Sequence, residues 1–438
     1  MHGRRDTPVR VAVLHRGGGS AELAEIKQAA RDVCQPVMFF DRSVVTEDSA
    51  LVREAEALFP VRIFDPPELI ECVREAEVGG VTTFHDWEVQ NVAAVSSALR
   101  LPGLSTGPGP WDKLTQRTRL AAVGLTNVTA VSVDSPQTFA EALDRVHLPA
   151  VLKPRRGVGG SGIAFVDSES DADYQLRHRT QWSDLLLESR LPPFEHPRKE
   201  WLADYVSVEM ASTQDDHVPV AIFDKAPVSV HRHTGPDASD AVSVTGDLTP
   251  TMLPHVVRKR VLDYVRKVLD ALRVQWCVTH TEVKLLPDAV DLIEVNGRVG
   301  GHLPRLLAVL GGPNLLTIAM NLALAQEPEI PPLADGGTQG YAMGLFPAFG
   351  ERTGTVHSAV SRDQLERYPC VIQVDEVAEH GAPRRASGYR AANVVLRAGE
   401  EEELTLAVTA IASGIATLFS ADGLDEDLWF ENFRSKNR

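Results

Sequence analysis

The first hundred residues alternate short apolar runs with longer segments in which apolar residues recur at helical spacing. The runs stand at 9–15, 36–41, 61–65 and 78–87, and a segment of helical pattern follows each of them. Short apolar runs are typical of buried strands, and the longer pattern is typical of amphipathic helices. Strands that alternate with helices form a parallel sheet with helices on its faces. We therefore predict an α/β domain over 1–105, bounded by the Gly- and Pro-rich segment LPGLSTGPGP.

The pattern changes beyond this segment. A helix is predicted over 111–125, followed by strands at 128–133 and 149–154, a hairpin over 204–225 and a long amphipathic helix near 254–273. We expect a flexible polar loop over 231–247. A second Gly- and Pro-rich segment at 327–340 precedes short strands and a C-terminal helix. These signals predict three domains in an α/β chain (α+β overall): the first, a central domain over 106–330 with a lid subdomain at about 128–208, and a mixed α+β domain over 331–438.

The overall charge of the protein argues against two classes of binding partner. The 438 residues carry a formal net charge of −16, which repels nucleic-acid phosphates and anionic lipid, so we expect neither a nucleic acid nor a membrane as partner. No uncharged apolar run reaches 18 residues, and the N-terminal run is too short for a signal peptide. The four cysteines form no CxxC pair, which argues against a zinc site. We expect a cytoplasmic protein.

A glycine-rich loop lies between two predicted strands, in the sequence KPRRGVGGSGIAFV at 153–166. Gly157, Gly159 and Gly162 fit a GxGxxG pattern, but a dinucleotide-binding fingerprint requires a helix after the glycines, and here the β-favouring IAFV follows. A Walker A loop is excluded because no Lys-Ser/Thr pair follows the last glycine. A glycine loop between strands can fold over nucleotide phosphates, and three basic residues accompany this one. A plain hairpin turn is the alternative.

The segment HTEVKLLPDAVDLIEVNGRVGG at 280–301 reads as two strands joined at 286–289. If the turn centres on Asp288, Glu282 faces Glu294 across an antiparallel pair. Because side chains alternate with period 2, Leu292, Glu294, Asn296 and Arg298 are expected on one side.

The two carboxylates of that hairpin would repel each other unless a cation or a proton lay between them. Carboxylate and amide oxygens suit Mg²⁺, so Glu282, Glu294 and Asn296 are candidate magnesium ligands. The alternative is a solvent-facing strand with ordinary charges. His280 lies on the same predicted face, where it is either a catalytic group or a packed, hydrogen-bonded histidine.

Together these motifs resemble the ATP-grasp superfamily, and most of all its carboxylate–amine ligases, in particular the bacterial L-amino acid and peptide ligases. The resemblance covers nearly the whole chain. WDKLTQRTRLAAVGL is similar to the family's DK-plus-helix segment, VLKPRRGVGGSGI to its glycine-loop segment, and HTEVK…DLIEVNGRVGG to its metal-binding signature. Residues 1–105 resemble the family's N-terminal domain, and 353–396 the C-terminal domain of these ligases and of biotin carboxylases. The chain departs from the pattern where Asn-Gly-Arg replaces the commoner Asn-Pro-Arg.

The resemblance implies roles for individual residues. Lys113 and Lys153 would bind ATP phosphates, Glu188 and Leu191 would belong to the hinge whose backbone receives adenine, and Asp204 would bind ribose. The full implied nucleotide-binding set is Lys113, Lys153, Gly157, Gly159, Gly160, Ser161, Gly162, Glu188, Leu191 and Asp204. The implied magnesium ligands are Glu282, Glu294 and Asn296. The implied catalytic residues are Arg298 for the transferred phosphoryl group, His280, and Arg305 for a substrate carboxylate.

The resemblance further implies an ADP-forming ligation that uses ATP and Mg²⁺. An amino acid or peptide carboxylate would attack the γ-phosphate to give an acyl phosphate, and an amine would then displace the phosphate. The partners would be these small molecules, and a homodimer is compatible with the resemblance. The alternatives are a biotin-carboxylase-like or purine-pathway ATP-grasp enzyme, and a nucleotide-binding module without catalysis.

Overall fold

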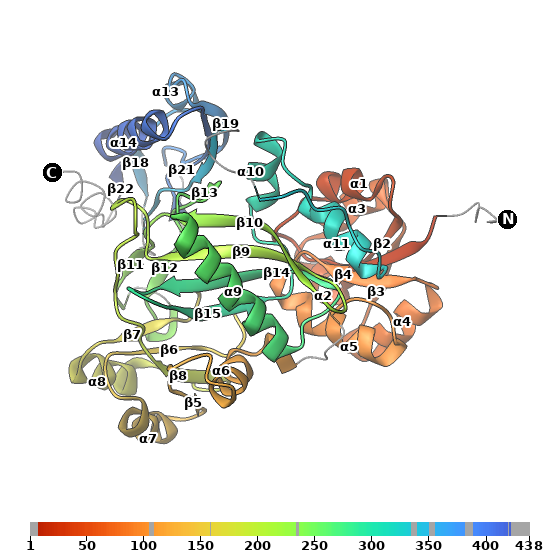
Figure 1. The fold of residues 1–438 in the computed structure, drawn as a ribbon, viewed down its shortest axis with the longest axis horizontal. Helices are drawn as coiled ribbons and strands as arrows, with labels where there is room; N and C mark the ends of the chain where they lie inside the picture. The colour runs from red at the N-terminus through yellow and green to blue at the C-terminus, as the bar shows by residue number, and fades with distance from the viewer. Residues whose placement is uncertain are drawn as a thin grey trace.

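The computed structural model describes residues 8–104, 109–157, 159–233, 236–333, 340–349, 355–381, 389–418 and 420–421. In these residues the strands form a four-stranded sheet near the N-terminus, an eight-stranded sheet in the middle, a second four-stranded sheet and several two-stranded pairs. Figure 1 shows the first three as separate parts of the molecule. Within the described residues, no helix has the length and apolar character needed to cross a bilayer.

The N-terminal sheet is parallel, in the order β3-β2-β1-β4, as the alternating pattern predicts. Its strands are β1(Arg10–Leu14), β2(Gln35–Asp41), β3(Val61–Phe64) and β4(Gly80–Thr83). Its helices are α1(Leu23–Ala30), α2(Arg42–Glu47), α3(Ser49–Leu58), α4(Leu69–Glu75) and α5(Val89–Leu99). Val11 and Val13 of β1 face one apolar cluster while Ala12 and Leu14 face another, because both faces of the sheet are covered.

The second four-stranded sheet, here called the lid sheet, has the order β5-β8-β6-β7. Its elements are β5(Ala130–Val133), α7(Pro136–Val146), β6(Ala150–Pro154), β7(Ala164–Val166), α8(Glu169–His178) and β8(Leu185–Ser189). The glycine loop connects β6 with β7, which are paired antiparallel strands. This sheet has a hydrophobic core of its own, which includes Phe139, Leu152 and Trp182.

The eight-stranded sheet, here called the central sheet, is antiparallel in the order β15-β14-β9-β10-β13-β16-β21-β19. Its strands are β9(Tyr205–Ser212), β10(His217–Lys225), β13(Gly246–Thr249), β14(Cys277–Leu285), β15(Val290–Asn296), β16(Tyr341–Leu345), β19(Val371–Val377) and β21(Ala392–Ala398). The strands β16, β19 and β21 belong to the predicted C-terminal domain, so that region continues the sheet of the central domain.

Helices cover the central sheet and connect it with its neighbours. The helix α9(His255–Leu272) crosses one face (Figure 1) and buries Val261, Val265, Val268, Leu269 and Leu272. The other α-helices in the described residues are α6(Lys113–Ala122), α10(Leu303–Val309), α11(Leu315–Ala323), α13(Arg362–Leu365) and α14(Glu401–Leu418). The remaining strands are the pairs β11(Ser229–His231)–β12(Ala241–Ser243), β17(Ala348–Phe349)–β20(Tyr389–Arg390) and β18(Val356–Ser358)–β22(Ser420–Ala421).

The expectation of a flexible polar loop over 231–247 is wrong in part, and residues 234 and 235 of this range lie outside the described residues. The strands β11 and β12 pair with each other, and β13 begins at Gly246 and joins the central sheet. Strands of three or four residues are too short to show a hydrophobic period, so the pattern of the sequence does not reveal them.

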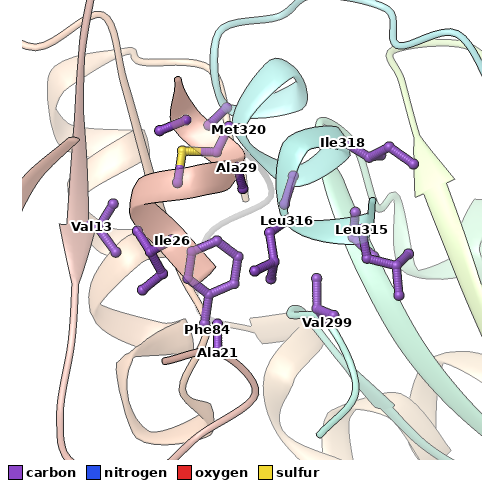
Figure 2. Close-up of a cluster of buried hydrophobic side chains, with 14 of the residues drawn as sticks. Val13, Ala21, Ile26, Ala29, Phe84, Val299, Leu315, Leu316, Ile318 and Met320 are labelled. Carbon is purple, nitrogen blue, oxygen red and sulfur yellow. The ribbon is translucent and has the colours of Figure 1, made fainter. Parts of the chain in front are cut away.

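The N-terminal sheet and the central sheet share one apolar core. Figure 2 shows Phe84, just after β4, lying between Ile26 of α1 and Leu316 of α11. Met320 and Val299 belong to the same buried cluster. This core fixes the segment that follows β4 against the segment that follows β15, which is where several candidate site residues lie.

Candidate active site

The hairpin β14–β15 brings the predicted acids together. Glu282 pairs with Glu294 and His280 with Asn296, as the parity of the sequence predicts. A bulge follows, because Val283 pairs with Leu292 and leaves Ile293 without a cross-strand partner.

Because of the bulge, Leu292 lies on the other face of the hairpin from the one that the sequence predicts. Leu292 packs in the apolar cluster that contains Val283 and Val295, so the expectation that it shares the side of Glu294 is wrong. The extra residue shifts the turn-end pairing by one position, and period-2 counting cannot see a bulge.

Glu294 is held by two neighbours. Lys113 Nζ lies 2.9 Å from its Oε2, and the Asn296 amide donates to its Oε1 at 2.8 Å. Burial alone would raise the pKa of Glu294, but Lys113 and Asn296 bring it down to about 2. The same ammonium donates to the carbonyl of Gly157 at 3.3 Å, so Lys113 connects this acid with the glycine loop.

Glu282 remains anionic for a similar reason. Burial raises its pKa, but His280 and Lys225 outweigh burial and lower it. Glu282, Glu294 and Asn296 thus offer two carboxylates and an amide side by side, a donor set that fits a magnesium ion completed by phosphate and water. Within the described residues, no group of three or more His, Cys, Asp or Glu side chains alone could hold a metal ion, so the protein donors fit Mg²⁺ only as part of such a mixed shell.

His280 is enclosed between two carboxylates. Its Nδ1 lies against Glu209 Oε1 in a short hydrogen bond, and its Nε2 lies 3.4 Å from Glu282 Oε1. Burial alone would lower the pKa of His280, but Glu209 and Glu282 raise it to about 9. Glu209 also accepts from the Gly300 amide at 3.0 Å. The prediction missed Glu209, although a glutamate within the mostly apolar run YVSVEMAS is a signal in the sequence. The structure shows that its side chain is fully buried.

Lys225 and Asp247 are further residues that the prediction missed. Lys225 Nζ lies 2.5 Å from Asp247 and 3.9 Å from Glu282. Both side chains are buried on the face of the central sheet that carries the acids. The acid pair therefore continues into a line of alternating charges.

Glu188 of the lid sheet lies between two cations. Lys153 Nζ is 2.6 Å from its Oε1, and Arg117 of α6 donates to both of its oxygens at 2.9 and 3.2 Å. Burial raises the pKa of Glu188, but these cations lower it to about 2. Arg117 also donates to the carbonyls of Leu292 and Ile293, so one guanidinium joins the lid sheet to the central sheet.

The other implied hinge residues lie beyond β8. Leu191 is a half-buried residue of the segment 190–204 that connects β8 with β9. Asp204 accepts from the Phe194 amide at 2.8 Å and lies 2.5 Å from Lys284 Nζ. The adenine and ribose roles of these residues stay predictions.

The two arginines of the predicted catalytic set are both paired. Arg298 makes two hydrogen bonds to Asp86, at 2.8 and 2.7 Å. Arg305 lies within 3.5 Å of Glu22, Glu25 and Asp375, in two other parts of the chain. The structure therefore brings Arg298 to the acid hairpin and engages Arg305 in a charge cluster formed by distant parts of the chain. A substrate role for Arg305 stays a prediction.

The backbone conformation of the glycine loop requires glycine at several positions. Gly159, Gly160 and Gly162 have φ of +62°, +77° and +76°, a region that L side chains rarely adopt. A Cβ on Gly160 would lie 3.0 Å from the carbonyl of Val242, and one on Gly162 would lie 2.8 Å from Pro154. Ser161 lies between these glycines, where the loop passes close to β12.

A cavity of about 310 Å³ opens beside these groups. Its walls include Asp86, Trp87, Trp111, Lys113, Gly157 and Asn296. It lies where the segment after β4, the start of α6, the glycine loop and the end of β15 meet. The arrangement can hold a polyanion, with Lys113 and the loop on one side and two anionic carboxylates beside it.

Comparisons with known proteins find relatives of this chain by sequence and by structure. No protein-family model matches the chain. The chain is 23% identical over 288 residues to the alanine–anticapsin ligase of Bacillus subtilis strain 168, a match that covers 60% of this chain and 59% of that protein. The chain thus spans about three fifths of the length of the curated relatives that it matches first.

Solved structures match over nearly the whole chain. The L-amino acid ligase of Bacillus licheniformis superimposes with a TM-score of 0.65 and 17% identity, covering 96% of this chain and 100% of that one. The phosphoribosylglycinamide synthetase of Anaerococcus prevotii has a TM-score of 0.62 and 14% identity, covering 94% and 99%. The chain has the ATP-grasp fold. The ATP-grasp resemblance of the motifs is thereby confirmed at the level of the fold.

Proposed function

We propose that this ATP-grasp protein is an ADP-forming ligase that joins the carboxylate of an amino acid or peptide to an amine through an acyl phosphate. The observation that carries the proposal is the cross-strand pair Glu282–Glu294, which Lys113 connects to the glycine loop. The similarity to an alanine–anticapsin ligase and to an L-amino acid ligase supports this choice among ATP-grasp reactions.

The nucleotide would lie between the lid sheet and the hairpin β14–β15. Lys113 and Lys153 would neutralise phosphate oxygens, and the glycine loop would close over them with backbone amides. Glu282, Glu294 and Asn296 would hold Mg²⁺, which when bound neutralises the charge on the phosphates. The MgADP complex of a biotin carboxylase domain from Hydrogenobacter thermophilus, a structure of similar fold, supports this cofactor.

The chain's own groups would then bring the reactants together. The substrate carboxylate attacks the γ-phosphorus, the bond to the bridging oxygen breaks, and ADP leaves. Arg298 would neutralise charge on the transferred phosphoryl group, because fixed donors stabilise a transition state without reorganisation. The amine then attacks the acyl carbon, phosphate leaves, and the amine loses a proton. His280, held by Glu209, would orient groups at the carboxylate side.

Location and assembly are part of the same proposal. We place the reaction in the cytoplasm, where ATP is available, and the free cysteines Cys34, Cys72, Cys277 and Cys370 fit a reducing compartment. A homodimer stays a prediction.

A substrate screen tests the function. Pairs of L-amino acids are incubated with MgATP, ADP release is measured, and products are identified by mass spectrometry. We expect ADP release that requires both an acid and an amine, and transfer of ¹⁸O from the acid carboxylate into phosphate. Bicarbonate-dependent turnover without an amine would favour a biotin-carboxylase-like reaction. ATP binding without ADP release under any substrate pair would favour a binding module.

A further inference from the structure

A second cluster lies on the face of the central sheet that carries the acid pair, and two of its three residues belong to the predicted C-terminal domain. It consists of His302, Phe346 and Arg390, and is here called the Arg390 cluster. The guanidinium carbon of Arg390 lies 4.7 Å from the centroid of the Phe346 ring, and its NH1 lies 3.4 Å from His302 Nε2. The rings of His302 and Phe346 are 4.9 Å apart.

Phe346 forms the floor of this cluster. A Cβ on Gly344 would lie 2.6 Å from the tip of the Phe346 ring, so the ring folds back over the bare Cα of Gly344. Gly344 is the cross-strand partner of Asp247, and Asp247 is that of Lys225. Since Lys225 reaches to 3.9 Å from Glu282, the Arg390 cluster continues the polar face that begins at the acid pair.

Arg390 differs from the other arginines of this region in its partners. Arg117, Arg298 and Arg305 each pair with at least one carboxylate. Across the described residues, Arg390 has no ion pair, and its polar contact is the His302 ring. Burial lowers the pKa of Arg390, although the charges of Glu376 and Asp247 act in the opposite direction. Burial, followed by Arg390 itself, also lowers the pKa of His302.

These contacts favour an anion as the missing partner. A guanidinium stacked on an aromatic ring presents its N–H edge in a fixed plane, and that edge matches the two oxygens of a carboxylate. The order of the central sheet puts β15 at one end and β16 towards the other, and the lid sheet lies beside the β15 end (Figure 1). The cluster thus lies on the side of the acid pair away from the proposed nucleotide, where a substrate would extend.

We propose that Arg390 and His302 bind a substrate carboxylate that the reaction does not consume. The inference rests on the proposed ligase function. The carboxylate belongs either to the amine substrate, as in a free amino acid, or to a second acid group on the phosphorylated substrate. In both cases the enzyme selects for an anionic group at a fixed distance from the reacting carbon.

The test compares Arg390→Gln and Arg390→Lys with wild type and with Arg397→Gln, a control at an exposed arginine of the adjacent strand β21. Free L-amino acids are offered as amines beside their amides, and monocarboxylic acids beside dicarboxylic ones. We expect Arg390→Gln to raise KM for the carboxylate-bearing substrate roughly 10- to 100-fold, as for a lost pair of charge-assisted hydrogen bonds. KM for ATP should not change. Arg390→Lys should recover part of the loss, and Arg397→Gln should match wild type.

Hydroxylamine distinguishes the two sources of the carboxylate. It replaces the amine and traps the acyl phosphate as a hydroxamate. If Arg390→Gln forms hydroxamate normally but ligates amino acids poorly, the carboxylate belongs to the amine. If hydroxamate formation also falls, the carboxylate belongs to the acid. Equal KM values in wild type and Arg390→Gln for every substrate would overturn the inference. A wild type that accepts amides as well as free amino acids, and monocarboxylic acids as well as dicarboxylic ones, would also overturn it.

A binding measurement separates this inference from the proposed function. Calorimetric titration of each amino acid and its amide into the protein, with a non-hydrolysable ATP analogue and Mg²⁺ present, needs no turnover. Without ADP release by wild type, the ligase proposal fails, yet selective loss of amino acid binding in Arg390→Gln still supports the anion site. Equal binding in both proteins overturns it. Thermal melting of both arginine variants checks that they are folded.

Discussion

Arg298 and Asp86 form a two-point ion pair, with Nε and NH2 of the arginine 2.8 and 2.7 Å from the two carboxylate oxygens. A third bond runs from NH1 to the carbonyl of Val299 at 2.9 Å. A guanidinium has five N–H donors, so two remain for a ligand. Asp86 itself lines the cavity beside the glycine loop. The segment after β4 therefore sets the plane in which Arg298 can act.

This pair predicts that lysine cannot replace Arg298. Lysine keeps the charge but loses the planar fork that meets both Asp86 and a phosphoryl group. We expect Arg298→Lys to lower kcat about 100- to 1,000-fold with little change in ATP affinity. Asp86→Asn, which leaves one acceptor, should have a smaller effect in the same direction. Near-normal kcat in Arg298→Lys would remove this residue from the catalytic set.

The acid pair gives a second prediction. Glu294→Gln removes the charge that Lys113 and Mg²⁺ would share, so ADP release should fall below detection. Retained circular dichroism and a cooperative melting transition would show that the fold survives. Glu195→Gln, at an exposed acid, is the control. Wild-type rates in Glu294→Gln would contradict the metal assignment.

The third prediction concerns stability. Glu188→Gln leaves Arg117 and Lys153 buried without their shared carboxylate. Removing one member of a buried charge cluster typically costs about 3–5 kcal/mol, and we expect a loss of this size in the free energy of unfolding. Urea titration measures it against the same control, Glu195→Gln. A loss below about 1 kcal/mol, the range of exposed ion pairs, would mean that water reaches the cluster.

The fourth prediction concerns pH. Burial, with a contribution from His85, lowers the pKa of His15 from 6.5 to about 4. Since the folded-state value is the lower one, the unfolded chain binds this proton more tightly, and stability falls as pH drops from 6.5 towards 4. By linkage the cost at pH 5 is about 2 kcal/mol. His15→Leu should become more stable relative to wild type by this amount between pH 7 and pH 5, and His255→Leu at an exposed site should not. A constant difference would contradict the prediction.

The sequence predicts local features of the site well because they depend on short spacings. The face-to-face position of Glu282 and Glu294 follows from strand parity and one turn. The side of Leu292 does not, since a bulge shifts it. Glu209 reaches His280 through the register of β9 with β14, and Asp86 reaches Arg298 through a core shared with another sheet. Such partners depend on contacts that no local pattern specifies.

The same limit applies to the fold. The alternating pattern predicts the parallel N-terminal sheet, and the long amphipathic period predicts α9. That β16 pairs with β13, and so continues the central sheet, is a contact between segments about a hundred residues apart. The short strands β11 and β12 fall below the length at which a period is visible.

The separate core of the lid sheet has a mechanical consequence. The N-terminal and central sheets share one apolar cluster and so form a single rigid unit. The lid sheet has a hydrophobic core of its own. A unit with its own core can rotate as a rigid body, whereas two sheets that share a core cannot move independently of each other. Arg117 donates hydrogen bonds to Glu188 of the lid sheet and to the carbonyls of Leu292 and Ile293 in the central sheet. We therefore expect the lid sheet to rotate about this side chain, opening to admit one nucleotide and closing over it for the reaction.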